Sequence, residues 1–197
     1  MIRPILLATA LSVSSVPALA DGHLASEKAA TAQIGPTVGQ PAPAIAAVKS
    51  DGSAATLDAL AGANGVTLVF VRSADWCPFC KTQMKDLEPV ANDLEAAGWP
   101  VAALSYDSPE ILADFKSENG LSYAFLSDAD SAMIDAFGLR NTGAKAGSRF
   151  DGIPHPAVVF VRADGTVAAV LREEGYKDRP QAEVIVETAG YLNEAAG

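Results

Sequence analysis

The chain has 197 residues, and its 24 Asp and Glu outnumber its 14 Lys and Arg to give a formal net charge of −10. A negative field of this size argues against nucleic acid or anionic lipid as a partner. The only two cysteines, Cys77 and Cys80, are too few for a small domain stapled by disulfides. With two histidines they also make a poor zinc site, so we expect no metal and no cofactor.

Residues 1–20 have the pattern of a secretory signal peptide. Met1–Arg3 carries a positive charge, Ile5–Val16 is apolar, and Ala18–Ala20 is a small-x-small cleavage site. The apolar stretch is shorter than the roughly 18–20 residues that a membrane-spanning helix needs, which argues against a retained anchor. We therefore expect an exported protein, periplasmic in a Gram-negative source, with no membrane contact once it is cleaved before Asp21.

Residues 21–37 are rich in small and polar residues without apolar periodicity, which predicts a flexible lead before a single folded domain over residues 38–197. At the start of that domain, Ala44–Thr56 alternates loosely around a turn at Asp51 and predicts a hairpin. The continuous apolar run Val66–Val71 is typical of a strand buried on both faces of a parallel or mixed sheet.

Strands and helices then alternate to the end of the chain. Three helices are expected at Phe79–Ala97, from Pro109 to about Gly120, and at Ala129–Phe137. Four strands are expected, at Trp99–Tyr106, Ala124–Leu126, Val158–Val161 and Thr166–Leu171, and the last two form a hairpin. A last helix is expected at Gln181–Glu194. Pro89 should kink the first helix without ending it. The order predicts an α/β sandwich around a mixed sheet.

The two cysteines lie where the buried strand passes directly into a helix. A helix N-terminus stabilises a thiolate, so we expect Cys77 to be the nucleophile, with a thiol pKa below that of Cys80. Cys80 lies one helical turn further on and can attack a mixed disulfide held on Cys77. Trp76 directly precedes Cys77, and Pro78, directly after Cys77, fits the first turn of the helix. A structural disulfide would close a very small loop and stabilise little, which favours redox chemistry.

Five short segments together resemble the redoxin branch of the thioredoxin superfamily. They are Val38–Pro43, Trp76–Cys80, Ser105–Pro109, Leu126–Asp128 with Phe137–Gly138, and His155–Val161 leading to Asp164–Gly165. This branch includes peroxiredoxins of the alkyl hydroperoxide reductase/thiol-specific antioxidant type and exported thioredoxin-like disulfide oxidoreductases. The resemblance implies a thioredoxin-like three-layer sandwich with a mixed central sheet.

The resemblance also implies a second element of the active site. Thioredoxin-like proteins have a cis-proline just before the first strand of the last hairpin, packed against the cysteines, and Pro156 fits this place better than Pro154. His155 would then lie near the thiols. It would either tune Cys77 as a titrating group or shape the rim of the site.

The chain departs from each relative at specific positions. A peroxiredoxin has Thr or Ser three residues before its peroxidatic cysteine, Pro seven residues before it, and an Arg further on. Here these positions hold Ala74, Phe70 and, by the hairpin count, Pro156. Thioredoxin has a buried Asp six residues before its first cysteine, and here that position is Val71. The first set of departures disfavours peroxide chemistry, and the second removes a familiar proton acceptor for Cys80.

Three functions follow from these residues. The first is an exported thiol-disulfide oxidoreductase, in which Cys77 attacks a substrate disulfide and Cys80 resolves it. Its direction, reduction or oxidation, is open. The alternative is a thiol peroxidase with antioxidant activity, in which Cys77 passes through a sulfenic acid. The third is a non-enzymatic copper carrier using both cysteines and His155. Either redox function needs a disulfide- or thiol-bearing substrate, protein or small thiol, and an external redox partner.

Overall fold

The computed structural model describes residues 33–175 and 177–195. The expected signal peptide and most of the expected lead lie outside these residues. Within the described part, Ile34 packs against the core and the Gly35 amide donates to the Gly138 carbonyl at 3.0 Å, so the last part of the expected lead contacts the domain at these two residues. Of the helices described, none combines the length and the apolar character needed to cross a membrane.

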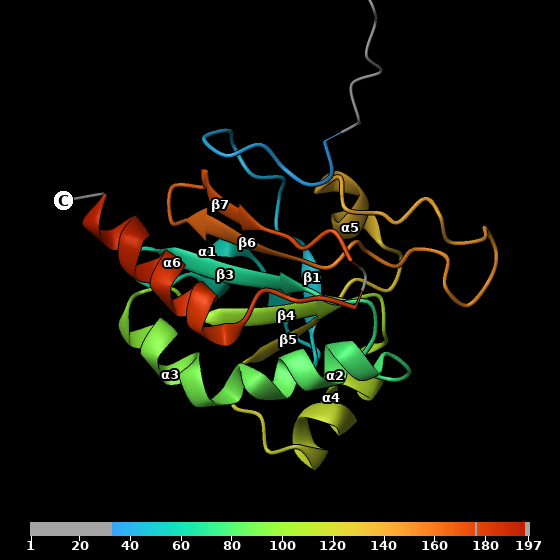
Figure 1. Cartoon of the computed structure of the whole chain (residues 1–197). Helices are drawn as coiled ribbons and strands as arrows, with labels where there is room; N and C mark the ends of the chain where they lie inside the picture. Colours follow the sequence, from blue (N-terminus) through green and yellow to red (C-terminus); the bar gives the residue numbers. More distant parts are fainter. Residues whose placement is uncertain (1–32, 176, 196–197) are drawn as a thin grey trace, which may run out of the picture. The chain divides into compact units, whose positions relative to one another are not determined.

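The strands of the described chain form one mixed seven-stranded sheet (Figure 1). They are β1 (Ala47–Lys49), β2 (Ala54–Ala55), β3 (Gly65–Phe70), β4 (Val101–Ser105), β5 (Ala124–Ser127), β6 (Ala157–Arg162) and β7 (Val167–Leu171). Their order is β2-β1-β5-β4-β3-β6-β7. The central strands β3, β4 and β5 are parallel, and β6 and β7 continue the sheet antiparallel beyond β3.

Helices cover both faces of this sheet (Figure 1). Their apolar side chains form a core on each face. The helices are α1 (Leu57–Leu60), α2 (Pro78–Asp86), α3 (Glu88–Ala96), α4 (Pro109–Glu118), α5 (Ala132–Ala136) and α6 (Ala182–Glu194). Side chains of α2, α3, α4 and α6 form one core, and those of α1 and α5 form the other. The expected three-layer α/β sandwich with a mixed sheet is confirmed.

Strand β3 shows why the sheet is covered on both sides. Successive side chains of a strand point to opposite faces. Leu68 and Phe70 accordingly join one core and Val69 the other, and all three are fully buried. The strand is therefore apolar without alternation, as the sequence predicted, and its end is fixed in position between two layers.

The long helix expected after the cysteines is divided in two, which corrects the prediction of a continuous kinked helix. Helix α2 ends at Asp86, Leu87 serves as the cap between the two helices, and α3 has Pro89 in its first turn. Proline has no amide hydrogen to donate to the carbonyl four residues earlier, and its ring clashes with that carbonyl. Starting a second helix removes both conflicts.

Helix α6 is attached to the other end of this helical layer by a buried indole. Trp99, fully buried, donates its Nε1–H to the Asn193 side chain at 2.7 Å, and Asn193 donates in turn to the Ala97 carbonyl at 3.0 Å. The segment between β7 and α6 thus connects the sheet to a helix that this contact holds at its C-terminal end.

Candidate active site

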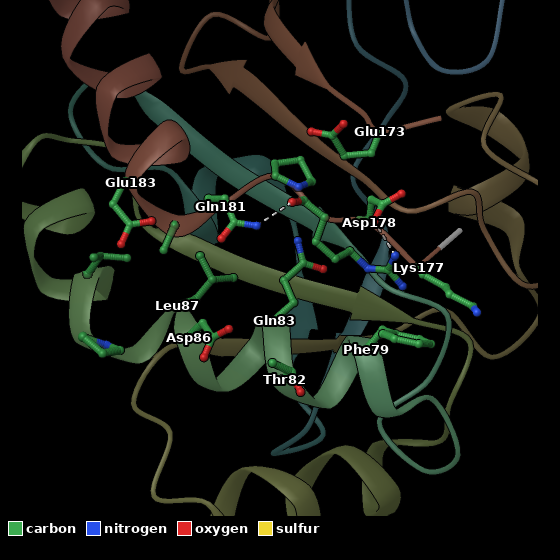
Figure 2. A pocket seen from close by; sticks show the side chains of 15 residues that line it. Phe79, Thr82, Gln83, Asp86, Leu87, Glu173, Lys177, Asp178, Gln181 and Glu183 are labelled. Atoms are coloured by element: carbon green, nitrogen blue, oxygen red, sulfur yellow. Dashed lines mark hydrogen bonds between the residues drawn. The ribbon is translucent and has the colours of Figure 1, made fainter. Parts of the chain in front are cut away.

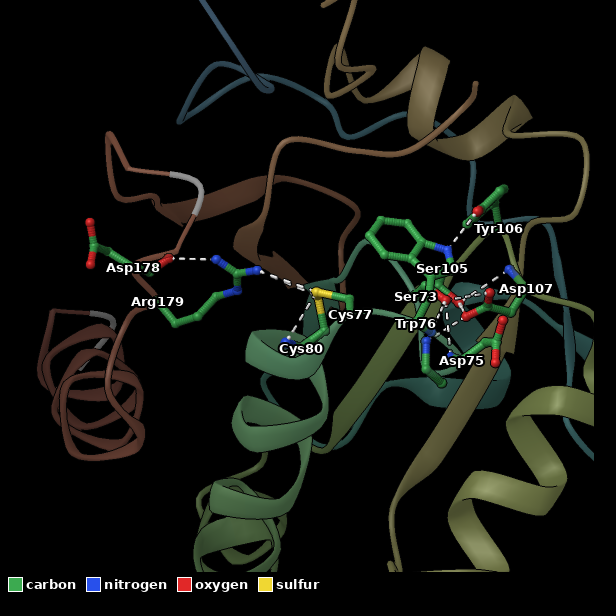
Figure 3. The surroundings of a disulfide bond; sticks show 11 residues. Ser73, Asp75, Trp76, Cys77, Cys80, Ser105, Tyr106, Asp107, Asp178 and Arg179 are labelled. Atoms are coloured by element: carbon green, nitrogen blue, oxygen red, sulfur yellow. Dashed lines mark hydrogen bonds between the residues drawn. A yellow bond between two sulfur atoms is a disulfide. The ribbon is translucent and has the colours of Figure 1, made fainter. Parts of the chain in front are cut away.

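Strand β3 and helix α2 place the cysteines at a strand-to-helix junction. Cys77 is the N-cap residue of α2, its Sγ accepts from the Cys80 amide at 3.3 Å, and Pro78 occupies the first turn. The two cysteines form a disulfide (Figure 3). Cys77 is 2 % exposed and Cys80 is fully buried, so Cys77 is the only one of the two that a substrate can reach without rearrangement.

A buried carboxylate holds the loop that carries Cys77. Asp107 accepts from the Ser73 hydroxyl at 2.8 Å and from the Ala74 amide at 2.6 Å, and the Ser73 Oγ accepts in turn from the Asp75 amide at 2.9 Å. Ser105 adds a further hydrogen bond to Asp107 at 2.8 Å (Figure 3). The carboxylate therefore satisfies donors that the irregular loop would otherwise leave buried without a partner.

The position of Asp107 follows from the sheet topology. Strands β3 and β4 are parallel, so the loop after β3 and the residues after β4 leave the sheet at the same edge. The main chain of Asp107 is fixed there too, because its carbonyl accepts from the Ser127 hydroxyl at the end of β5, at 2.7 Å. Three neighbouring strands thus converge on the loop before Cys77.

Trp76 connects the cysteine loop to a second loop. Its Nε1–H donates to the Tyr106 hydroxyl at 2.9 Å, which in turn donates to the Arg149 carbonyl at 2.6 Å. The Phe150 ring stands edge-on to the indole at 4.8 Å, and the guanidinium groups of Arg72 and Arg149 lie over it. Burial raises the pKa of Tyr106, so its hydroxyl stays protonated and can make both hydrogen bonds.

Arg179, from the segment between β7 and α6, brings a positive charge to the two sulfurs. Its guanidinium lies 3.4 Å from the Cys80 Sγ and 3.9 Å from the Cys77 Sγ, and it also donates to the Asp178 carbonyl at 2.7 Å (Figure 3). Burial, with the nearby charge of Arg72, lowers the pKa of Arg179 to about 10. The group is therefore still charged at neutral pH.

Two sources of positive potential meet at Cys77. One is the N-terminus of α2, through the Cys80 amide, and the other is Arg179. Both stabilise a thiolate. Cys80 lies closer to Arg179 but is completely buried and is not capped by a helix amide, and burial disfavours a thiolate. The geometry is consistent with Cys77 as the nucleophile.

His155 and Pro156 lie at the edge of the sheet from which the cysteine loop departs, because Ala157 pairs with Phe70. No cis peptide bond occurs in the described residues, so the expected cis-proline at Pro156 is wrong. The His155 amide donates to the Leu139 carbonyl at 2.6 Å, which holds the chain before Pro156, and X-Pro bonds ordinarily favour trans. Burial lowers the pKa of His155, as do the charges of Arg172 and Arg72, so the imidazole is neutral at pH 7.

The residues that depart from the relatives have structural roles here. Ala74 is buried in the core and uses only its amide, and Val71 is fully buried among apolar side chains. The copper-carrier hypothesis required Cys77, Cys80 and His155 to converge. Among the residues that the structure describes, no three His, Cys, Asp or Glu side chains are grouped to hold a metal ion, so the structure does not bring that set together.

A groove of about 660 Å³ lies between α2 and the segment before α6 (Figure 2). Arg179, which contacts the sulfurs, lines it together with Phe79, and the lining continues along α2 through Gln83 and Leu87. Phe79 is 39 % exposed, which gives the groove an apolar rim next to the reacting atoms.

Comparison with known proteins assigns the fold and site to a family. The AhpC/TSA family model matches residues 38–170. A putative peroxiredoxin of Mycobacterium tuberculosis is 30 % identical over 149 residues, covering 70 % of this chain and 94 % of the relative. Peroxiredoxin Bcp of Escherichia coli is 30 % identical over 133 residues, covering 68 % and 83 %. The crystal structure of peroxidoxin BcpB from M. tuberculosis has a TM-score of 0.67 at 18 % identity, covering 84 % and 99 %.

The chain belongs to the AhpC/TSA family, in the redoxin branch of the thioredoxin superfamily. Its fold is the thioredoxin-like sandwich that the sequence predicted. The protein is a thiol-based oxidoreductase.

Sequence reasoning missed Arg179 and Asp107 as parts of the site. The segment Ser105–Pro109 was recognised only as a point of resemblance, although a polar residue after a buried parallel strand is a usable signal. Arg179 lies in an irregular segment without periodicity, 99 residues from Cys80, and the sequence has no local signal for it.

Asp107→Ala tests the role of the buried carboxylate. The change leaves the Ser73 and Ser105 hydroxyls and the Ala74 amide without their acceptor, and we expect it to lower the free energy of unfolding by about 3 kcal/mol. Urea unfolding of the protein measures this. The matched control is Asp75→Ala, an exposed carboxylate in the same loop, with an expected change within about 0.5 kcal/mol. Equal losses in the two variants would contradict the role.

Arg179→Met tests the effect of the guanidinium on the thiols. Removing the cation raises the pKa of the Cys77 thiol, so alkylation of the reduced protein by iodoacetamide at pH 7 should slow about tenfold. Mass spectrometry across a pH series should find Cys77 labelled before Cys80. Arg149→Met is the control, because Arg149 stacks over Trp76 and Phe150 instead. An unchanged pH profile, or labelling of Cys80 first, would refute the assignment.

Proposed function

We propose that the protein is a thiol peroxidase that uses Cys77 as the peroxidatic residue and Cys80 as the resolving residue. The Cys77 thiolate attacks one peroxide oxygen, the O–O bond breaks, and the departing oxygen takes a proton to leave as water or an alcohol. Cys80 then attacks the sulfenic acid on Cys77, forming the disulfide and releasing water. Two electrons and two protons from an external thiol partner regenerate the dithiol.

The guanidinium of Arg179, 3.9 Å from the Cys77 Sγ, is the observation that carries this proposal. It supplies the cation that the sequence, with Pro156 at the usual position, was expected to lack. A cation beside the thiolate also stabilises the negative charge that develops on the departing peroxide oxygen. The low exposure of Cys77 favours a small oxidant such as a peroxide over a folded substrate. The family relatives named as peroxiredoxins support the same chemistry.

Thiol–disulfide exchange is the second candidate, and specific residues favour it. Ala74 offers no side-chain hydrogen bond to a peroxide, and Cys77 and Cys80 form a redox couple across a single helical turn. In either case we propose that the protein works after export, in the periplasm of a Gram-negative source, on the strength of the pattern in residues 1–20.

Cys80→Ser separates the two candidates. Without the resolving thiol, an equimolar amount of hydrogen peroxide should leave a sulfenic acid on Cys77 that dimedone traps and mass spectrometry detects. Cys77→Ser, the matched control, should form no adduct at residue 80 at a comparable rate. If Cys80→Ser gives no adduct while the wild-type protein rapidly reduces protein disulfides, the second candidate replaces the first.

A further inference from the structure

The groove beside the disulfide has the length of a short peptide. Its lining runs along the helical layer from Phe79 to Val90 on one side and is closed on the other by residues 177–183 (Figure 2). At 1.5 Å per helical residue this is on the order of 16 Å, or about five residues of an extended chain. Arg179 lines one end of the groove and also contacts both sulfurs, so a chain lying in the groove ends one side chain away from the disulfide.

Gln83 gives the groove a hydrogen-bonding group that the protein itself does not use. The side chain rises from α2 into the groove (Figure 2), and the residue is only 6 % exposed. Its Oε1 is buried and has no hydrogen-bond partner within residues 33–175 and 177–195. A buried acceptor without a donor is costly, and a ligand N–H removes that cost. Apolar side chains of Leu87 and Val90 lie next to it along the same wall.

The charged residues around the groove indicate which sign of charge a ligand should carry. Four exposed carboxylates line it: Asp86, Glu173, Asp178 and Glu183. Two cations oppose them, and one of these, Arg179, is directed at the sulfurs. The outer part of the groove is therefore acidic, in keeping with the net charge of the chain. An anionic small thiol is repelled there, whereas a segment carrying Lys or Arg is attracted.

We propose that this groove seats an extended, cationic, cysteine-containing segment of the protein thiol that reduces the Cys77–Cys80 disulfide. A backbone N–H of the segment donates to the Gln83 Oε1, its apolar side chains cover Leu87, and its basic side chains face Glu183. The inference rests on the proposed function, because peroxide turnover leaves the disulfide that this partner must reduce.

The exchange is balanced within the two proteins. A thiolate of the segment attacks the Cys77 Sγ, the Cys77–Cys80 bond breaks, and Cys80 leaves as a thiolate that takes up a proton. A second thiol of the partner then attacks the mixed disulfide and releases Cys77. The partner is oxidised to a disulfide, and two electrons and two protons pass to the pair.

Two synthetic peptides of equal length test the proposal. Each has one cysteine with apolar neighbours, and the outer residues are Lys in one peptide and Glu in the other. We measure the rate at which each peptide forms a mixed disulfide with the oxidised protein at low ionic strength. Each rate is divided by the rate at which dithiothreitol reduces the disulfide of the same protein. The Lys peptide should react about tenfold faster than the Glu peptide with wild type.

Variants of the protein test whether the groove carboxylates cause the preference for the Lys peptide. The double change Asp86→Asn with Glu183→Gln should bring the ratio of Lys-peptide to Glu-peptide rates close to one. Asp93→Asn, an exposed carboxylate of α3 outside the groove lining, should leave the ratio as in wild type. Gln83→Leu should slow both peptides, because it removes the acceptor for the backbone N–H.

A ratio of Lys-peptide to Glu-peptide rates near one in wild type would overturn the proposal that the groove binds a cationic peptide. So would an Asp93→Asn variant in which this ratio falls as much as in the double variant. Failure of the proposed function gives a different result, since peroxide consumption with dithiothreitol as the only electron donor would then be absent whatever the peptides do.

Discussion

The contact between the Arg179 guanidinium and the two sulfurs is the interaction on which the chemistry of this protein depends. Without it, Cys77 would keep the helix N-terminus but lose this guanidinium as a stabiliser of its thiolate, in a setting with little exposure to water. With it, a charge that remains present at neutral pH lies against the reacting atoms. In the peroxidase mechanism that we propose, a permanent cation in a poorly solvated site acts on both the thiolate and the oxygen that leaves during oxidation.

This contact forms only if two parts of the chain, the cysteine loop and the segment with Arg179, are each held in position by their own contacts. The cysteine loop is fixed by the Asp107 carboxylate, where three strands end at one edge of the sheet. The segment with Arg179 is fixed between β7 and α6, and α6 is attached to the helical layer through the buried Trp99 and Asn193. The disulfide lies where the two meet. The acidic groove lies along the same boundary, and Arg179 both lines the groove and contacts the sulfurs.

The parts of the structure set by local patterns could be predicted from the sequence. The apolar run of β3, the N-cap at Cys77 with Pro78 behind it, and the final hairpin and helix follow from residues close together in the chain. The division of α2 from α3 at Leu87 was missed, because Pro89 decides between a kink and a break through contacts that periodicity does not describe. Arg179 and Asp107 depend on long-range placement, 99 and 33 residues from the groups they contact.

The most direct measurement of the central claim is the second-order rate constant for hydrogen peroxide with the reduced protein, compared between wild type and Arg179→Met by stopped flow. If the guanidinium stabilises both the thiolate and the departing oxygen, the rate constant at pH 7 should fall by about 10²-fold or more. It should stay low at a pH at which Cys77 is fully ionised in both proteins. Equal rate constants in the two proteins at that higher pH would confine Arg179 to setting the pKa of Cys77, and equal rate constants at every pH would contradict the account.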